Sequence, residues 1–204
     1  MIITDIVKLD KKKSKIISDE GVLFSLYNSE IGKFSIAIGE ELQEKDYRYI
    51  VDEVLYPRAK ERALHLLESS EKTKYQINQK LKDGYYPEQI IERVIAFLES
   101  YNLVDDYRYC NLYINTYSSS KSIKVLQLEL IKKGVSKNVI EDVISAHETI
   151  DETTYIIKLL IKKKYLEVKS DYKLKNKVIS YILRKGYDYE SICSAISELE
   201  NQNS

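Results

Sequence analysis

A glycine-centred motif occurs three times along this chain and constrains the fold more than any other feature of the sequence. The copies are residues 81–85 (LKDGY), 131–135 (IKKGV) and 183–187 (LRKGY), about 50 residues apart. A period of this length is typical of stacked supersecondary units. Glycine is a common helix stop, because it adopts the left-handed conformation without strain. The helix stops expected from this motif are Gly84, Gly134 and Gly186.

An amphipathic helix is expected after each glycine. The repeating residues are an isoleucine six positions after the glycine and a branched aliphatic residue four positions later, on the same helix face. They are Ile90, Ile140 and Ile192, followed by Val94, Ile144 and Ile196. Ser136 and Asp188 are suitable N-caps for the second and third of these helices. In the first repeat this helix is expected over 87–99, with Pro87 as its first helical residue.

A further helix precedes the motif in each repeat. The apolar spacing predicts helices over 58–68, from Asp105 or Asp106 to about 117, and over 152–164. Thr73 and Gln76 form a capping-box pattern at the start of the motif helix in the first repeat. We interpret Asp105 and Asp106 as helix caps, in preference to a carboxylate pair for a metal ion or acid–base chemistry.

The predicted fold class is all-α. Three tandem three-helix repeats are expected to form an elongated, solenoid-like body, preceded by a small N-terminal β-hairpin module. The predicted domains are 1–45 for the β-rich module, and 46–104, 105–150 and 151–204 for the repeats.

The N-terminal module is predicted from short β-rich segments. Residues 2–9, 15–18 and 22–27 are expected strands, and Gly21 is placed in a hairpin turn at the position that needs a positive φ. A last strand is expected at 34–38. A sheet this small is not stable alone, so we expect it to pack on the helices that follow.

The charge is unevenly distributed, although the formal net charge is zero. Residues 121–185 contain about 15 basic and about 8 acidic side chains, an excess of roughly +7. Two interpretations stay open: a surface for an acidic or polyanionic partner, or solvated helix faces. Cations in the last turn of a helix also stabilise it by complementing the helix dipole.

Residues for catalysis or metal binding are sparse. Cys110 and Cys193 lack a CxxC spacing, and His65 and His147 lack a nearby nucleophile pattern. The sequence contains no P-loop, GxGxxG or HExxH motif. We therefore expect no enzyme activity, no metal and no cofactor. The N-terminus lacks a signal-peptide pattern and no apolar run is long enough for a membrane span, which predicts a cytoplasmic protein.

Four segments resemble motifs of the RecX family, in the family's order. Residues 103–110 (LVDDYRYC) are similar to Leu-x-Asp-Asp-x-Arg-Phe/Tyr-Ala, and 73–81 (TKYQINQKL) to Ser-x-x-Glu-Leu-x-x-Lys-Leu. Residues 126–135 (LQLELIKKGV) resemble Ile-x-x-Glu-Leu-x-x-Lys-Gly-Ile, and 183–187 resembles Leu-Arg-Arg-Gly-Phe. The β segment looks like the extension of longer members from Gram-positive bacteria.

The sequence departs from the family pattern at a few positions. Ser70 and Lys72 stand where the family often has an Arg-x-Arg pair, which removes one cation and weakens the case for phosphate binding there. Ser122 stands where the family often has glycine, and Cys110 replaces the usual alanine. These two exchanges are interpreted as tolerated changes in turn chemistry and packing.

The resemblance implies a non-catalytic regulator of the RecA recombinase. Proteins like this lie in the deep groove of the RecA–DNA filament, and they block filament growth or promote its loss. They thereby dampen recombination, ATP hydrolysis and the SOS response, and some also touch DNA. A monomer is expected.

The candidate partner-binding residues are the basic side chains of the repeats, together with an arginine of the most recognisable motif. They are Lys82, Arg108, Lys121, Lys124, Lys132, Lys133, Lys162, Lys163, Lys164, Arg184 and Lys185. The main alternative is direct binding of single- or double-stranded DNA without RecA, with tyrosines as stacking platforms. A third is a helical scaffold for another protein, which predicts an exposed apolar patch.

Overall fold

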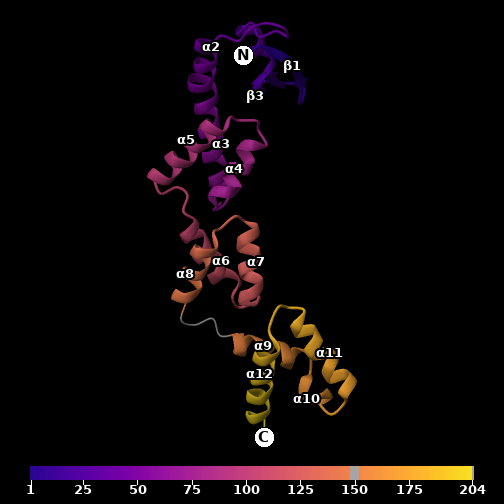
Figure 1. Ribbon diagram of the computed structural model, residues 1–204. Helices are drawn as coiled ribbons and strands as arrows, with labels where there is room; N and C mark the ends of the chain where they lie inside the picture. The colour runs from indigo at the N-terminus through magenta and orange to yellow at the C-terminus, as the bar shows by residue number, and fades with distance from the viewer. Residues whose placement is uncertain (148–151, 204) are drawn as a thin grey trace. The chain divides into compact units, whose positions relative to one another are not determined.

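The structure, a computed structural model, describes residues 1–147 and 152–203. It is mostly helical (Figure 1), and the chain divides into two compact units, Met1–Asp105 and Asp106–Ser204. The first holds the N-terminal sheet and the first repeat, and the second holds the other two repeats. No helix among the described residues is long and apolar enough to cross a membrane.

The N-terminal sheet has three antiparallel strands in the order β1 (Ile3–Lys8), β2 (Lys13–Ser18) and β3 (Gly21–Tyr27). Gly21 has a φ of 117°, as predicted for the hairpin turn between β2 and β3. Ile16 on the central strand lies opposite Ile6 on one side and Phe24 on the other.

The prediction of a strand at 34–38 is wrong. A short helix, α1 (Asn28–Lys33), follows the sheet, because the Glu30 carboxylate accepts a 2.8 Å hydrogen bond from the backbone N–H of Tyr27 and caps that helix. Ser35 then takes a left-handed φ of 52°, which turns the chain. Ile36 is buried from irregular backbone rather than from a strand.

The first repeat begins with one long helical segment. It consists of α2 (Glu44–Tyr49), a π-helical turn η1 (Ile50–Leu55) and α3 (Tyr56–Ser69). Pro57 has no backbone N–H to donate to the carbonyl four residues earlier, so α-helical bonding is interrupted at η1. The repeat is completed by α4 (Lys74–Lys82) and α5 (Glu88–Ser100).

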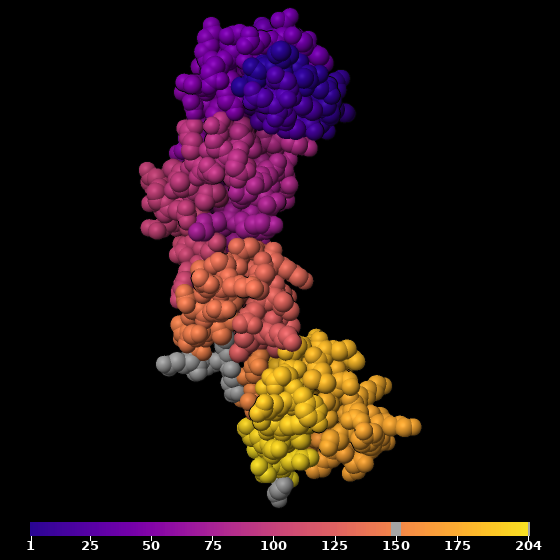
Figure 2. Space-filling model, in the orientation of Figure 1, coloured from indigo at the N-terminus to yellow at the C-terminus, as the bar shows by residue number. Residues whose placement is uncertain are grey.

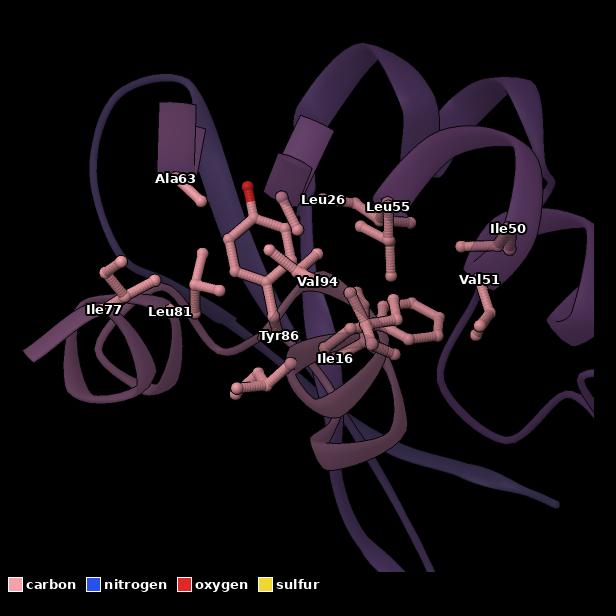
Figure 3. Close-up of a cluster of buried hydrophobic side chains, with 14 of the residues drawn as sticks. Ile16, Leu26, Ile50, Val51, Leu55, Ala63, Ile77, Leu81, Tyr86 and Val94 are labelled. Atoms are coloured by element: carbon pink, nitrogen blue, oxygen red, sulfur yellow. The ribbon is translucent and has the colours of Figure 1, made fainter. Parts of the chain in front are cut away.

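The sheet and the first repeat share one hydrophobic core. Ile16 and Leu26 from the strands lie in the same buried cluster as Leu55, Leu81 and Val94 from the helices (Figure 3). The side chains of this unit form one continuous body in the space-filling view (Figure 2). This confirms the expectation that the sheet packs on the helices that follow it.

The second unit contains seven helices among its described residues. The second repeat consists of α6 (Asp106–Tyr117), α7 (Ile123–Lys132) and α8 (Lys137–Ala146). The third consists of α9 (Glu152–Lys162), the single turn α10 (Tyr165–Val168), α11 (Tyr172–Leu183) and α12 (Tyr189–Asn201). Each repeat has its own buried cluster.

The turn after the motif helix corrects one prediction. Gly134 and Gly186 have positive φ angles of 83° and 93°, as expected of helix stops. In the first repeat the left-handed residue is Tyr85, with a φ of 57°, and Gly84 has no positive φ. Gly84 is needed for space, because a Cβ there would lie 2.9 Å from the ring of Tyr86.

The first repeat is therefore shifted by one residue relative to the other two. Counted from the left-handed residue, the next residues are Tyr86, Val135 and Tyr187, all buried. The N-caps that follow are Pro87, Ser136 and Asp188, so Pro87 precedes its helix rather than opening it. The basic residues Lys132 and Arg184 correspond to Asp83, and the predicted basic helix end does not recur at that position in the first repeat.

Gly186 lies at a close contact between the second and third repeats. A Cβ there would lie 2.5 Å from the Ser122 hydroxyl and 2.6 Å from a methyl carbon of Val125. Gly39 has a similar φ of 86°, but nothing lies within 4 Å of a Cβ built there.

We expect Gly39→Ala to cost about 1 kcal/mol through backbone strain. Gly186→Ala is expected to cost about 1–2 kcal/mol more, because overpacking adds to that strain. Midpoints of urea unfolding, compared at equal slope, measure both changes. Equal shifts for the two variants would mean that the contact around Gly186 relaxes without cost.

Candidate partner-binding surface

In the second repeat, a carboxylate neutralises one of the candidate lysines. The Lys121 ammonium lies 2.8 and 2.6 Å from the two carboxylate oxygens of Glu129. The Tyr113 hydroxyl donates a 2.7 Å hydrogen bond to the same carboxylate. The hydrogen bond from Lys121 is the largest cause that lowers the pKa of Glu129, and burial is the largest that raises the pKa of Tyr113. Part of the charge of Lys121 is thus neutralised within the repeat.

A row of tyrosines on α6 runs beside these charges. The ring of Tyr113 lies 6.1 Å from that of Tyr109 and 4.6 Å from that of Tyr117, centroid to centroid. Lys121 lies 4.5 Å from the Tyr117 centroid and Lys133 lies 5.2 Å from the Tyr113 centroid. The three tyrosines recur every four residues, so one helix face carries them.

The third repeat has a tyrosine where the second has the carboxylate. Tyr181 and Glu129 both lie five residues before the left-handed glycine of their repeat. Lys163 and Lys185 lie 4.3 and 5.8 Å from the Tyr181 centroid. A tyrosine ring attracts cations without neutralising them, so this pair keeps its charge for a partner.

The other candidates differ in their surroundings. Lys82, in the first unit, forms an ion pair with Glu88 at 3.0 Å, and Lys164 one with Glu167 at 3.4 Å. Arg108 is half-buried in the first turns of α6, which begins at Asp106 directly after Asp105. Four exposed candidates have no hydrogen-bonding or ion-pair partner within the described parts of the chain. They are Lys124, Lys132, Lys162 and Arg184.

The caps that position these helices agree with their sequence patterns. The Thr73 hydroxyl accepts a 3.1 Å hydrogen bond from the Gln76 backbone and the Gln76 side chain accepts one in return, which confirms the capping box. The Ser122 hydroxyl caps α7, and it also donates a 3.3 Å hydrogen bond to the Lys185 carbonyl. Ser122 thereby holds the basic turn of the third repeat against the second.

Glu152 forms a second contact between these repeats. Its carboxylate accepts a 2.6 Å hydrogen bond from the backbone N–H of Ile123, the first residue of α7. The hydrogen bond and the helix N-terminus both favour the carboxylate. Burial opposes them and prevails, so the pKa of Glu152 is raised above its ordinary value of 4.5.

This shift predicts how the stability of the second unit depends on pH. Because its folded-state pKa is the higher one, Glu152 keeps its proton in the folded chain at pH values where the unfolded chain has lost it. Its contribution to stability therefore rises as the pH falls from neutrality, through the raised pKa, to about 4.5.

Glu152→Gln is expected to remove this dependence. The stability of the variant minus that of the original protein should decrease as the pH is lowered over this window. Urea unfolding of both proteins at several pH values measures the difference. The contributions of the other carboxylates are the same in both proteins and cancel. A difference that stays constant, or grows on acidification, would contradict the assignment.

Cys110 contributes to packing rather than to a reactive centre. Cys110 is fully buried on α6, and burial followed by the nearby Asp106 raises its pKa to about 11. Cys110 therefore stays a thiol at neutral pH, and the thiolate is the form that reacts.

The sequence predicted the lysines of this surface and tyrosines in general as stacking platforms, but neither the tyrosine row on α6 nor Glu129. Lys121 and Lys133 gather on the second repeat, and Lys163 and Lys185 on the third. Lys82 belongs to the other compact unit. The four-residue spacing of the tyrosines on α6 was the available signal.

Comparisons with known proteins agree with this arrangement of repeats. Family models described as the first, second and third three-helix domains of RecX match residues 59–98, 105–144 and 151–196. The chain is 32% identical to "Regulatory protein RecX" of Clostridium perfringens (strain 13), over 97% of this chain and 94% of that one. It is 32% identical to the protein of the same name from Clostridium acetobutylicum, over 98% and 97%.

Solved structures share the fold. A crystal structure of regulatory protein RecX aligns over 98% of both chains with a TM-score of 0.64 and 23% identity. The crystal structure of RecX from Lactobacillus salivarius aligns with a TM-score of 0.65 and 27% identity, over 71% of this chain and 96% of that one.

Proposed function

This chain belongs to the RecX family of regulatory proteins, and from that premise we propose that it is a negative regulator of the RecA recombinase. It binds in the groove of the RecA–DNA filament, and it limits filament growth or promotes disassembly. The protein acts by binding rather than by catalysis, and it works in the cytoplasm.

The observation that carries the proposal is the set of unneutralised cations in the second unit. Lys132 and Arg184 occupy equivalent positions of consecutive repeats and are exposed, without a carboxylate partner among the described residues. Lys163 and Lys185 face a tyrosine ring instead of an acid. Charges left unpaired on consecutive repeats suit a partner that presents acidic groups periodically, as a protein filament does.

The test is RecA ATP hydrolysis on single-stranded DNA, with RecA from the same source. We expect this protein to reduce the rate when added well below one molecule per RecA subunit, because blocking growth at an end affects many subunits. Inhibition that needs one molecule per subunit would favour coating of the groove. An unchanged rate at equimolar protein would refute the proposal.

Direct DNA binding is a second candidate function, favoured by the lysine–tyrosine pairs around Tyr113 and Tyr181. Bases stack on tyrosine rings and phosphates bind lysines. This function predicts that a labelled oligonucleotide binds without RecA, with an affinity that falls steeply with salt. Fluorescence anisotropy at several salt concentrations distinguishes it from a RecA-dependent activity.

A further inference from the structure

A groove between α7 and α8 adjoins the candidate basic residues described above, of which it includes Lys124. It has a volume of about 320 Å³, and one stripe of each helix lines it. Lys124, Gln127, Leu128 and Ile131 come from α7, and Lys137, Ile140 and Glu141 come from α8. Ile140 is buried and forms the floor, whereas Leu128 and Ile131 remain 52% and 42% exposed.

Leu128 and Ile131 give α7 a second apolar side. Leu126 and Leu130, both fully buried, already form the side of this helix that faces the core. The side chains of Leu128 and Ile131 contribute less to the stability of the repeat than fully buried ones, because about half of each stays in contact with water. Folding of the second repeat therefore does not account for them.

The other repeats provide an internal comparison. The residues equivalent to Leu128, counted from the left-handed residue, are Gln79 in the first repeat and Ser180 in the third. Those equivalent to Ile131 are Lys82 and Leu183. The repeat architecture is thus compatible with polar residues at both positions, and the apolar pair is particular to the second repeat.

The lysines at the rim identify the chemistry of the occupant. Lys124 and Lys137 lie in the first turns of α7 and α8, where the helix dipole disfavours cations. Both are exposed, and neither has a hydrogen-bonding or ion-pair partner in the described part of the chain. Glu141 is the one acid of the lining, so two cations face one anion. Helix stability does not explain these lysines, whereas an acidic occupant does.

We propose that this groove binds an amphipathic helical segment of a protein partner, with apolar side chains on one face and acidic residues beside them. Leu128 and Ile131, one turn apart on α7, line the groove together with Ile140 of α8 and match the spacing of anchors on a docked helix. Acidic side chains next to the anchors would reach Lys124 and Lys137. The inference deepens the proposed function, on which it rests for the partner, by adding an apolar contact to the basic surface.

The test transfers the side chains of the first repeat to the second. Leu128→Gln with Ile131→Lys places the equivalents Gln79 and Lys82 in the groove. The matched control is Leu183→Lys in the third repeat, whose side chain is 41% exposed, close to the 42% of Ile131. Circular dichroism tests whether both variants keep their helix content, as we expect.

Affinity for RecA filaments on single-stranded DNA is the first readout. We expect the double variant to bind about tenfold more weakly, which corresponds to about 1.4 kcal/mol, and the control to bind as the original protein does. Equal affinities for all three proteins would overturn the groove proposal and leave the proposed function intact.

A synthetic peptide tests the groove without RecA. The probe is an amphipathic helix of about 15 residues, with leucines on one face and glutamates beside them, and the control peptide has lysines in place of the glutamates. We expect the acidic peptide alone to bind, and its binding to be lost in the double variant. If the protein does not bind RecA filaments, the proposed function fails. The peptide experiment still shows whether the groove binds an acidic amphipathic helix.

Two results would overturn the proposal in this second arm. One is a failure of the acidic peptide to bind the original protein. The other is a dimer of the original protein that the double variant dissociates, because the occupant is then a second copy of this chain. Sedimentation of both proteins measures the latter.

Discussion

Replacement of Lys132, Lys133, Arg184 and Lys185 by glutamate is expected to abolish inhibition of RecA ATP hydrolysis by this protein. The four residues lie at the ends of the equivalent helices α7 and α11, and the change places acids where an acidic partner meets cations. Like charges at an interface cost several kcal/mol, which corresponds to a loss of affinity of roughly a thousandfold or more. The measurement is the protein concentration that halves the ATPase rate.

A matched control separates this surface from net charge. Lys8, Lys11, Lys12 and Lys45 are exposed in the first unit, and their replacement by glutamate changes the net charge by the same amount. We expect this control to inhibit nearly as well as the original protein. Inhibition that survives the first set of changes would show that the partner binds another face.

The loss of function has to be distinguished from unfolding. Lys132 lies in the last turn of α7, and Lys133 and Arg184 are the C-caps of α7 and α11. Cations at the C-terminal end of a helix stabilise it by about 0.3–1 kcal/mol each, so the quadruple variant loses stability as well as charge. Its helix content and its urea midpoint therefore accompany the ATPase measurement. A variant that remains folded under assay conditions and fails to inhibit supports the basic surface.

The repeats were predictable from the sequence because their signals are local. The N-caps at Thr73, Ser136 and Asp188, and the glycines after two of the motif helices, act within a single turn of chain. Hydrophobic periodicity then identifies the buried face of each helix. The bounds predicted for α3, α5, α6 and α9 agree with the structure to within a few residues. The extension of the first helix back to Glu44 through α2 and η1 lies outside the helix predicted over 58–68, and the single turn α10 was not predicted.

One wrong assignment arose where distant contacts override local preference. Gly84 was the expected left-handed residue, but Tyr85 takes that conformation in the first repeat. The Lys15 ammonium lies 5.1 Å from the centroid of the Tyr85 ring, and the Ser25 hydroxyl donates a 2.8 Å hydrogen bond to the Gly84 carbonyl. Both contacts come from the sheet, far away in the sequence, so no local pattern predicts them.

The candidate surface was predictable only in part, because it too depends on contacts between residues far apart in the sequence. Its lysines are visible in the sequence as local excess charge. Whether a lysine is neutralised depends on a partner from another helix, as with Lys121 and Glu129. Lys163 and Lys185 are more than 20 positions apart, and only the fold places them beside one ring.

Phe24→Ala is expected to destabilise the first unit by about 3–5 kcal/mol, the range for truncation of a buried phenylalanine. Phe24 is fully buried on β3, and its ring stacks on that of Tyr47 from α2 at a centroid distance of 6.0 Å. The same cluster includes Ile50 and Leu55, so the cavity opens between the sheet and the helices of the first repeat. Urea unfolding of the full chain measures the loss.

The control lies two residues away on the same strand. Val22 is 52% exposed, so Val22→Ala removes little buried area and is expected to cost at most about 0.5–1 kcal/mol. A small effect of Phe24→Ala, similar to that of Val22→Ala, would mean that the sheet docks weakly and that the first repeat is stable without it. A large effect makes the sheet part of the first repeat's core, because a domain with one shared core unfolds cooperatively.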